Sequence, residues 1–155
     1  AKPFGLMFRA LDDLKPHEVY ICTGSSPRYA LWGGLMSTRA IHLKAAGAVL
    51  DGFCRDTSEI LELNFPTFCM GSFAQDQGPR GKVVDYQVPI EIEGVAIRPG
   101  DIVYGDRDGV LVIPVEAAEE AMTKAFEKVS TESKVRLAIR NGMSTVEAFE
   151  TFGVM

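Results

Sequence analysis

The order of strand-like and helix-like segments constrains the fold of this chain more than any other feature. Three short β-branched or apolar runs predict buried strands, at residues 19–23, 48–50 and 67–70. Two segments with helical spacing separate them: residues 30–46, which Gly47 would close as a C-cap, and residues 56–63. This alternation predicts right-handed crossovers and a parallel sheet.

The second half of the chain has antiparallel patterns instead. Alternating apolar and polar residues or turn glycines predict four strand segments, at residues 83–88, 90–98 (with a turn at Gly94), 101–104 and 110–113. An amphipathic helix over residues 116–140 follows, and Ser144-Thr-Val-Glu147 has the capping-box pattern that opens a last helix. We therefore predict one α/β domain over residues 1–155, with mixed parallel and antiparallel β structure.

Composition and charge exclude several functional classes. A net charge of -5 argues against a nucleic-acid partner, which would require a basic face. No apolar run approaches the roughly 20 residues that span a bilayer, so we expect no membrane partner. Cys22, Cys54 and Cys69 are odd in number and lack Cys-x-x-Cys spacing, which predicts reduced thiols in a cytoplasmic protein.

The chain offers few side chains for metal chemistry other than carboxylates. His17 and His42 are the only histidines and lie too far apart in the sequence for a local metal pair, so each is expected to be a structural histidine. A metal site here would therefore use carboxylate oxygens, and these favour a hard ion such as Mg²⁺.

Arg55 and Asp56 form the strongest candidate site. They follow a predicted buried strand at the start of a helix, where parallel α/β sheets usually bind ligands. A guanidinium can hold a carboxylate with two hydrogen bonds, and a carboxylate can hold Mg²⁺ directly or through water. Together they would bind a 2-oxo acid, with Arg55 on its carboxylate and the metal on its keto oxygen, where charge develops in an enolate.

Two structural alternatives remain open. Asp56 is also a good N-cap, and with Glu59 it forms the Asp-x-x-Glu pattern of a capping box. Gly33 and Gly34 could expose backbone N–H groups to a substrate anion, or could only allow close packing of a helix on the sheet.

Several motifs, spread in order over nearly the whole chain, resemble the RraA-like family. They are Trp32-Gly-Gly-Leu-Met-Ser-Thr-Arg39, Ala46-Gly-Ala-Val-Leu-Asp-Gly52, Arg55-Asp56, Leu63-Asn-Phe-Pro66 and the run from Pro99-Gly-Asp to Val-Ile-Pro114. That family includes 4-hydroxy-4-methyl-2-oxoglutarate aldolases that also decarboxylate oxaloacetate, and a regulator of ribonuclease activity. Some members formerly carried a demethylmenaquinone methyltransferase label.

The resemblance implies a three-layer β/β/α swivelling fold of the phosphohistidine-domain type, in homotrimers or dimers of trimers with sites at subunit boundaries. It implies an additional N-terminal segment, which the non-Met residue Ala1 also led us to expect. By position, Asp56 would be the Mg²⁺ or Mn²⁺ ligand and Arg55 would bind the 2-oxo acid. The substrate-binding backbone would be Gly33, Gly34, Leu35 and Met36.

One departure from the family pattern affects the expected chemistry. The aldolases have an Asp twenty-one residues before the arginine, where this chain has Gly34. Aldol cleavage would then need another acid or base, such as Glu59 or a carboxylate of another subunit. We expect a metal-dependent carbon–carbon lyase that cleaves a 4-hydroxy-2-oxo acid, decarboxylates oxaloacetate or carries out a related sugar-acid reaction. The alternative is a non-catalytic regulator that binds an RNA-processing enzyme, although the family's regulator lacks the Asp that Asp56 retains.

Overall fold

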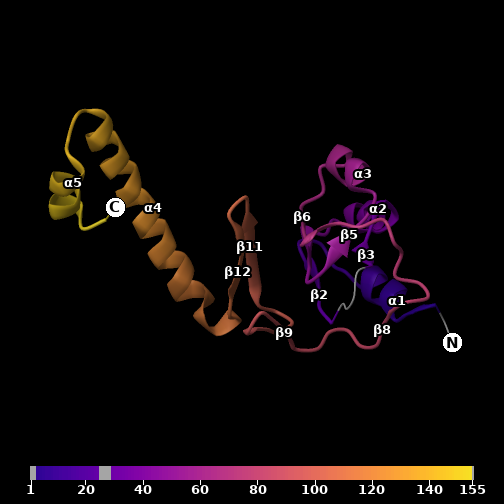
Figure 1. Cartoon of the computed structure of the whole chain (residues 1–155). Helices are drawn as coiled ribbons and strands as arrows, with labels where there is room; N and C mark the ends of the chain where they lie inside the picture. The colour runs from indigo at the N-terminus through magenta and orange to yellow at the C-terminus, as the bar shows by residue number, and fades with distance from the viewer. Residues whose placement is uncertain (1–2, 25–28, 155) are drawn as a thin grey trace. The chain divides into compact units, whose positions relative to one another are not determined.

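The computed structural model describes residues 3–24 and 29–154. These residues form two compact units, Ala1–Val112 and Ile113–Met155 (Figure 1), which we describe separately. The expected α/β class with parallel and antiparallel β structure is confirmed. The single-domain expectation stays a prediction.

The predicted parallel sheet is present in the first unit. Its strands are β2 (Val19–Cys22), β4 (Gly47–Leu50) and β6 (Thr67–Phe68), hydrogen-bonded in the order β2-β4-β6. Both pairings are parallel, with Val19 opposite Gly47 and Ala48 opposite Thr67. All three expected strands are therefore confirmed, although β6 stops before Cys69.

A second parallel sheet was not predicted. It consists of β3 (Ala30–Trp32), β5 (Phe53–Cys54) and β7 (Gly71–Ser72), in the order β3-β5-β7. The helix predicted over residues 30–46 was wrong at both ends, because α2 covers only Gly34–His42 and Gly47 begins β4. Residues 30–32 are buried on both faces, and such a short apolar run has no periodicity that separates strand from helix.

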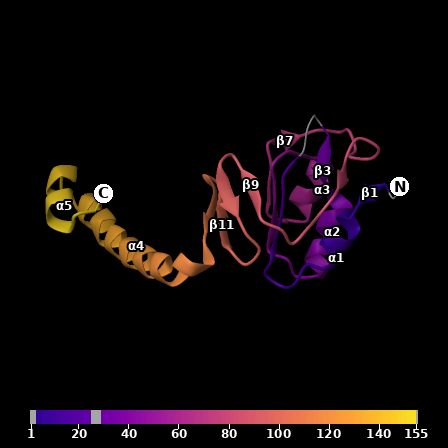
Figure 2. The same ribbon diagram turned by 90° about the horizontal axis from the view of Figure 1, so that it is seen from below.

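The remaining elements of the α/β region are short. Helices α1 (Met7–Asp12) and α2 lie side by side (Figure 2), and an ion pair of 2.8 Å joins Arg39 Nε to Asp12 Oδ1. Helix α3 spans Thr57–Glu62. Strand β1 (Phe4–Gly5) pairs in parallel with β8 (Lys82–Val83), so the strand predicted over residues 83–88 was wrong beyond its first residue.

The predicted hairpins are confirmed. Strands β9 (Ile90–Ile92) and β10 (Val95–Ile97) pair antiparallel around Gly94, which has a φ of 83°. Strands β11 (Ile102–Asp106) and β12 (Gly109–Ile113) form the next two-stranded sheet. A Cβ added at Gly105 would lie 2.7 Å from Phe68 Cζ, so this glycine lets β11 approach the Phe68 ring closely.

The core of the first unit is centred on Trp32, which is only 1% exposed. Its ring stacks on Phe65 with centroids 6.0 Å apart and lies at a tilt to Tyr20 at 5.0 Å. Its indole Nε1 donates a 2.7 Å hydrogen bond to Ser37 Oγ in α2, and both residues are fully buried. This bond joins the end of β3 to the helix that follows it.

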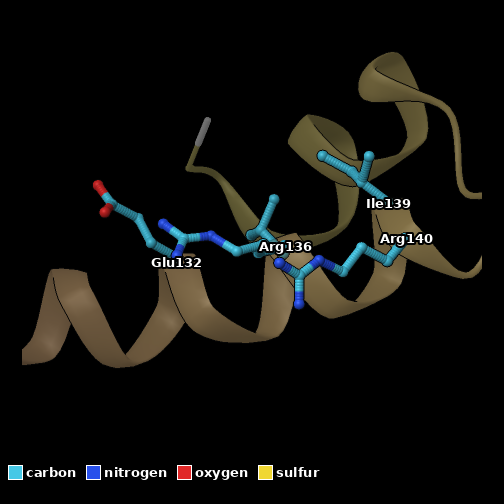
Figure 3. Close-up of a pocket in the computed structure, with 5 residues that line it drawn as sticks. Glu132, Arg136, Ile139 and Arg140 are labelled. Carbon is cyan, nitrogen blue, oxygen red and sulfur yellow. The ribbon is translucent and has the colours of Figure 1, made fainter.

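The second unit is helical. A 3₁₀ turn (Val115–Ala117) leads into α4 (Ala118–Arg140), and α5 (Thr145–Phe152) begins with the predicted capping box of Ser144 and Glu147. Only Val135 of α4 is buried. It contributes to the lining of a shallow pocket of about 400 Å³, together with Glu132, Arg136, Ile139 and Arg140, which Figure 3 shows on and near the helix. Among residues 3–24 and 29–154, no helix combines the length and apolar character that a membrane span requires.

The Trp32–Ser37 bond gives a stability prediction. Ser37→Ala should lower the free energy of unfolding by about 1 to 3 kcal/mol, because it leaves a buried indole N–H without an acceptor. Urea unfolding followed by circular dichroism measures the effect. Thr38→Ala is the matched control: it removes a hydroxyl on the same helix that donates to the Gly34 carbonyl, and it should cost about 0.5 kcal/mol or less. Equal effects of the two substitutions would contradict the assignment.

Candidate active site

The candidate site lies where two neighbouring parallel strands end. Strand β3 leads through Gly33 into α2, and β5 leads through Arg55 and Asp56 into α3. The strands are adjacent, and the Arg55 N–H continues their ladder with a 2.9 Å hydrogen bond to the Trp32 carbonyl. The sheet therefore brings the glycine pair and the Arg-Asp pair together, at the edge where α/β sheets bind ligands.

Asp56 does not cap its own helix. Its backbone is left-handed, with a φ of 56° and a ψ of 37°, and its side chain makes no cap hydrogen bond to α3. The Asp56 Oδ2 atom instead accepts a 3.1 Å hydrogen bond from the Gly34 N–H at the start of α2. The capping-box alternative for Asp56 and Glu59 is therefore wrong, and the carboxylate faces the glycine pair. Non-glycine residues in this conformation are uncommon, and aspartate is among those that adopt it most readily.

Gly33 is required because Asp56 and Arg55 approach it closely. A Cβ added at Gly33 would lie 2.7 Å from Asp56 Oδ2 and 3.3 Å from Arg55 Cγ. The glycine thus makes room for the two candidate site residues rather than only for packing of the helix on the sheet. That distinction favours the functional interpretation of the glycine pair.

Glu59 occupies the space beside Gly34. A Cβ added at Gly34 would clash with the Glu59 carboxyl group, whose Oε1 would lie 2.7 Å away. The carboxylate of α3 therefore stands where a side chain at position 34 would begin. A carboxylate from a different helix thus lies in the space of a side chain at position 34. This placement is consistent with the expectation that Glu59 supplies the acid missing at Gly34.

Arg55 and the first turn of α2 offer hydrogen-bond donors around this carboxylate pair. Arg55 is half-buried, and within residues 3–24 and 29–154 its guanidinium forms neither an ion pair nor a hydrogen bond. The N–H groups of Leu35 and Met36 belong to the first turn of α2, where no carbonyl four residues earlier lies within the helix. The Gly34 N–H, by contrast, is already engaged by Asp56, so Leu35 and Met36 remain the better-placed amides for a substrate.

The oxygen atoms available as metal ligands at this site suit a hard divalent cation. Asp56 and Glu59, which lies in the first turn of α3, are both exposed, so the nearby side-chain ligands are carboxylate oxygens. The described residues contain no group of three or more His, Cys, Asp or Glu side chains that could form a complete cage. Mg²⁺ does not need one, because it commonly keeps several waters and binds through one or two carboxylates and the substrate.

Cys22 and Cys54 are poor candidates for nucleophilic catalysis. Burial raises the pKa of the Cys22 thiol to about 12, with a contribution from the Asp51 charge. Burial likewise raises the pKa of Cys54 to about 11, assisted by the hydrogen bond and charge of Cys69. Neither thiol is ionised near neutral pH, and the thiolate is the reactive form. His17 and His42 are both exposed.

Sequence analysis did not find a pair of hydroxyl groups near the ends of β5 and β7. Thr57 Oγ1 and Ser72 Oγ lie 2.8 Å apart. Thr57 directly follows Asp56 in the sequence, and Ser72 lies opposite Cys54 in the sheet register. Only recognition of the two-residue strand β7 could have indicated this pair. A cavity of about 680 Å³ in the first unit is lined mainly by residues along β2 and between residues 82 and 103, and not by Arg55 or Asp56. Asp56 and Glu59 are exposed, so the candidate site is open at the surface.

The proximity of Gly34 and Glu59 can be tested without an activity assay. Gly34→Ala should interact unfavourably with Glu59, because the new methyl group forces the carboxylate to move. In a double-mutant cycle of unfolding free energies with Glu59→Ala, we expect a coupling of about 0.5 to 1 kcal/mol. The same cycle with Glu62→Ala, which removes an exposed carboxylate from the same helix, should give no coupling. Equal coupling in both cycles would contradict the placement of Glu59.

Comparison with known proteins assigns the chain to a family. The RraA-like family model, described as Aldolase/RraA, matches residues 2–112. A putative 4-hydroxy-4-methyl-2-oxoglutarate aldolase of Halalkalibacterium halodurans is 34% identical over 145 residues, covering 92% of this chain and 68% of that protein. Other curated relatives are longer, and this chain spans 23% and 54% of two of them.

Solved structures agree with this assignment. An uncharacterized protein from Pseudomonas syringae has a TM-score of 0.91 and 29% sequence identity, over 97% of this chain and 71% of that one. Streptomyces coelicolor RraAS2, described as an unusual member of the RNase ES inhibitor RraA family, has a TM-score of 0.79 and 28% identity, over 84% of this chain and 67% of that one. The family match, the shared fold and the Arg55-Asp56 junction together show that the chain belongs to the RraA-like (Aldolase/RraA) family.

Proposed function

We propose that this protein is a divalent-metal-dependent lyase that acts on a small 2-oxo acid at Arg55 and Asp56. The observation that carries the proposal is the orientation of Asp56: its left-handed backbone directs the carboxylate to Gly34 and away from its own helix. Relatives named as 4-hydroxy-4-methyl-2-oxoglutarate aldolases support a lyase. The substrates we propose are 4-hydroxy-2-oxo acids, oxaloacetate or a related sugar acid.

Arg55 and the start of α2 would bind the substrate. The guanidinium would hold the carboxylate with two parallel hydrogen bonds, while the amides of Leu35 and Met36 would orient the same end of the molecule. Asp56 would hold Mg²⁺ or Mn²⁺, with water or substrate completing the coordination. The bound cation would supply electrophilic polarisation of the keto oxygen.

Glu59 is the residue we propose as proton carrier. Its carboxyl group lies against Gly34, and Glu59 belongs to the first turn of α3, the helix that Asp56 precedes. In aldol cleavage it would take the proton of the 4-hydroxyl group as the carbon–carbon bond breaks. In decarboxylation it would deliver a proton to carbon 3 of the enolate that remains after CO₂ leaves. Both roles replace the carboxylate that other members carry at position 34.

We also propose that the protein works as a homotrimer or a dimer of trimers in the cytoplasm. An open site must exclude water to strengthen its electrostatic interactions, and a neighbouring subunit could cover it. Leu35, beside the glycine pair, is 81% exposed, and Leu61 and Met70 are also exposed large apolar residues of the first unit. Such side chains favour burial at an interface. The three free cysteines are consistent with a reducing compartment.

Asp56→Asn tests the metal-binding role. Asparagine tolerates the left-handed conformation and its amide oxygen can accept the Gly34 N–H, so the variant differs mainly in charge. We expect Mg²⁺-dependent turnover of oxaloacetate and of 4-hydroxy-2-oxo acids to fall by about a hundredfold or more, because an anionic ligand is lost. Pyruvate formation, with and without EDTA, is the measurement.

The fold of the same variant provides the control. Urea unfolding of Asp56→Asn should remain within about 1 kcal/mol of the parent, whereas Asp56→Ala loses the hydrogen bond to Gly34 as well. The lyase proposal fails if none of these acids is turned over in a metal-dependent way, or if the parent and Asp56→Asn have equal rates.

Glu59→Gln tests the proton carrier. The substitution keeps the shape of the side chain and removes its acid–base function, so kcat should fall by about a hundredfold with little change in KM. Glu62→Gln alters an exposed carboxylate of the same helix and should leave both constants close to those of the parent. A Glu59→Gln variant with full kcat would exclude this residue as the acid or base.

The alternative is a non-catalytic regulator of an RNA-processing enzyme. The observation that favours it is the structural likeness to RraAS2, whose family description names an RNase ES inhibitor. A pull-down with an RNA-processing endonuclease distinguishes the two functions. Capture that persists in Arg55→Ala, together with no turnover by the parent, would support the regulator; capture is not expected of the lyase.

A further inference from the structure

Two of the three cysteines lie next to each other and to the candidate site. Cys54 Sγ and Cys69 Sγ are 3.3 Å apart, with the Cys69 thiol also 3.5 Å from the Gly71 carbonyl oxygen. Cys54 is the last residue of β5, and Cys69 follows β6 in the other parallel sheet. The contact therefore joins the two sheets directly before Arg55.

The two thiols of the pair differ in their exposure to solvent. Cys54 is buried, at 4% exposed, whereas Cys69 is partly exposed. An oxidant from solvent would reach Cys69 first, and Cys54 would be the neighbouring thiol that reacts with the product. Cys22 is on β2, and among the described residues its side chain forms no hydrogen bond with either sulfur.

We propose that Cys54 and Cys69 form a reversible disulfide when a peroxide oxidises the protein, and that this disulfide lowers the activity of the Arg55-Asp56 site. The effect on activity rests on the lyase function proposed above. The disulfide itself rests only on the geometry of the two sulfurs.

The chemistry balances with hydrogen peroxide as the oxidant. The Cys69 sulfur attacks one peroxide oxygen; an S–O bond forms, the O–O bond breaks, and the first water leaves, which gives a sulfenic acid. The Cys54 sulfur then attacks the Cys69 sulfur while its thiol proton passes to the leaving hydroxyl; the S–S bond forms, the S–O bond breaks, and the second water leaves. The raised pKa of the Cys54 thiol slows this second step, whereas the 3.3 Å separation of the two sulfurs favours it. Two thiols and one peroxide thus yield one disulfide and two waters. A dithiol reductant reverses the reaction by exchange.

The bond would constrain the segment that carries the site. Sulfur atoms in a disulfide lie about 2.05 Å apart, so the present 3.3 Å separation must close by more than about 1 Å. Cys54 is held on one side by the Phe73 N–H, which donates to its carbonyl at 2.8 Å, and the next residue is Arg55, bonded to Trp32. A shift here would be passed to Arg55 and to the 3.1 Å bond between Gly34 and Asp56. Displacements of about 1 Å can cost an enzyme a hundredfold in rate.

Peptide mapping tests the disulfide directly. Trypsin cleaves after Arg55 and separates the two cysteines into residues 45–55 and residues 56–80, while Cys22 falls in residues 10–28. After treatment of the full chain with one equivalent of hydrogen peroxide, we expect the first two peptides linked and one free thiol left per chain. Absence of the linked peptides would overturn the proposal.

Activity and backbone exchange test the consequence. Oxidised protein should turn over oxaloacetate at least about tenfold more slowly than reduced protein, and dithiothreitol should restore the rate. Hydrogen exchange of residues 53–59 and 33–36 provides a readout that does not depend on the lyase function. If the reduced protein has no activity but oxidation changes exchange in these segments, the lyase proposal fails and the coupling stands. Unchanged exchange, or a parent-like rate in protein with the linked peptides, would overturn the coupling.

Matched variants assign the effect to the pair. Cys69→Ser and Cys69→Ala should form no linked peptides and should keep their activity after peroxide, whereas Cys22→Ser should behave as the parent does. Equal inactivation of the Cys69 variants would attribute the loss to another oxidised residue and overturn the proposal.

Discussion

The hydrogen bond from the Gly34 N–H to the Asp56 carboxylate organises the candidate site. It joins the ends of two adjacent parallel strands, β3 and β5, through the first residues of the helices that follow them. An anionic side chain at the start of α2 is also favoured by the helix dipole. The position of Asp56 is thus set by main-chain geometry on both strands, and Arg55 takes its position from the same ladder.

Glycine makes this arrangement possible at two successive positions for two different reasons. Gly33 gives room to the Asp56 and Arg55 side chains, and Gly34 gives room to the Glu59 carboxyl group. Both carboxylates therefore approach the turn between β3 and α2 from the following strand–helix junction. The Glu59 carboxyl group thus lies where a side chain at position 34 would begin, which is the arrangement that our proposal for Glu59 requires.

The position of Arg55 and Asp56 at the end of a parallel strand could be predicted from the sequence because it depends on features with strong local signals. The apolar runs at β2 and β4 and the turn at Gly94 are visible in the sequence, and Arg55-Asp56 follows a buried strand in a chain-wide family pattern. Strands β3, β5 and β7 have only two or three residues, which is too short for any period. The second sheet, and with it the contacts of Thr57 with Ser72, therefore could not be predicted.

The orientation of the side chains could not be predicted either. Asp56 and Glu59 match the sequence pattern of a capping box. The Asp56 backbone is left-handed, however, and its side chain accepts a hydrogen bond from Gly34, 22 residues away in the sequence. The approach of Glu59 to Gly34 and of Cys54 to Cys69 also depends on pairing between strands. Sequence spacing reports contacts within one element, whereas these contacts arise only when separate elements are packed.

The burial of Trp32 has a practical consequence for work on this site. It is the only tryptophan of the chain, it is 1% exposed, and its neighbour in the sequence is Gly33. Its indole is stacked on Phe65 and hydrogen-bonded to α2. The chain thus contains one tryptophan, placed at the base of the glycine turn, and four tyrosines. Selective excitation of the indole gives an emission spectrum that reports on changes in that turn without any added label.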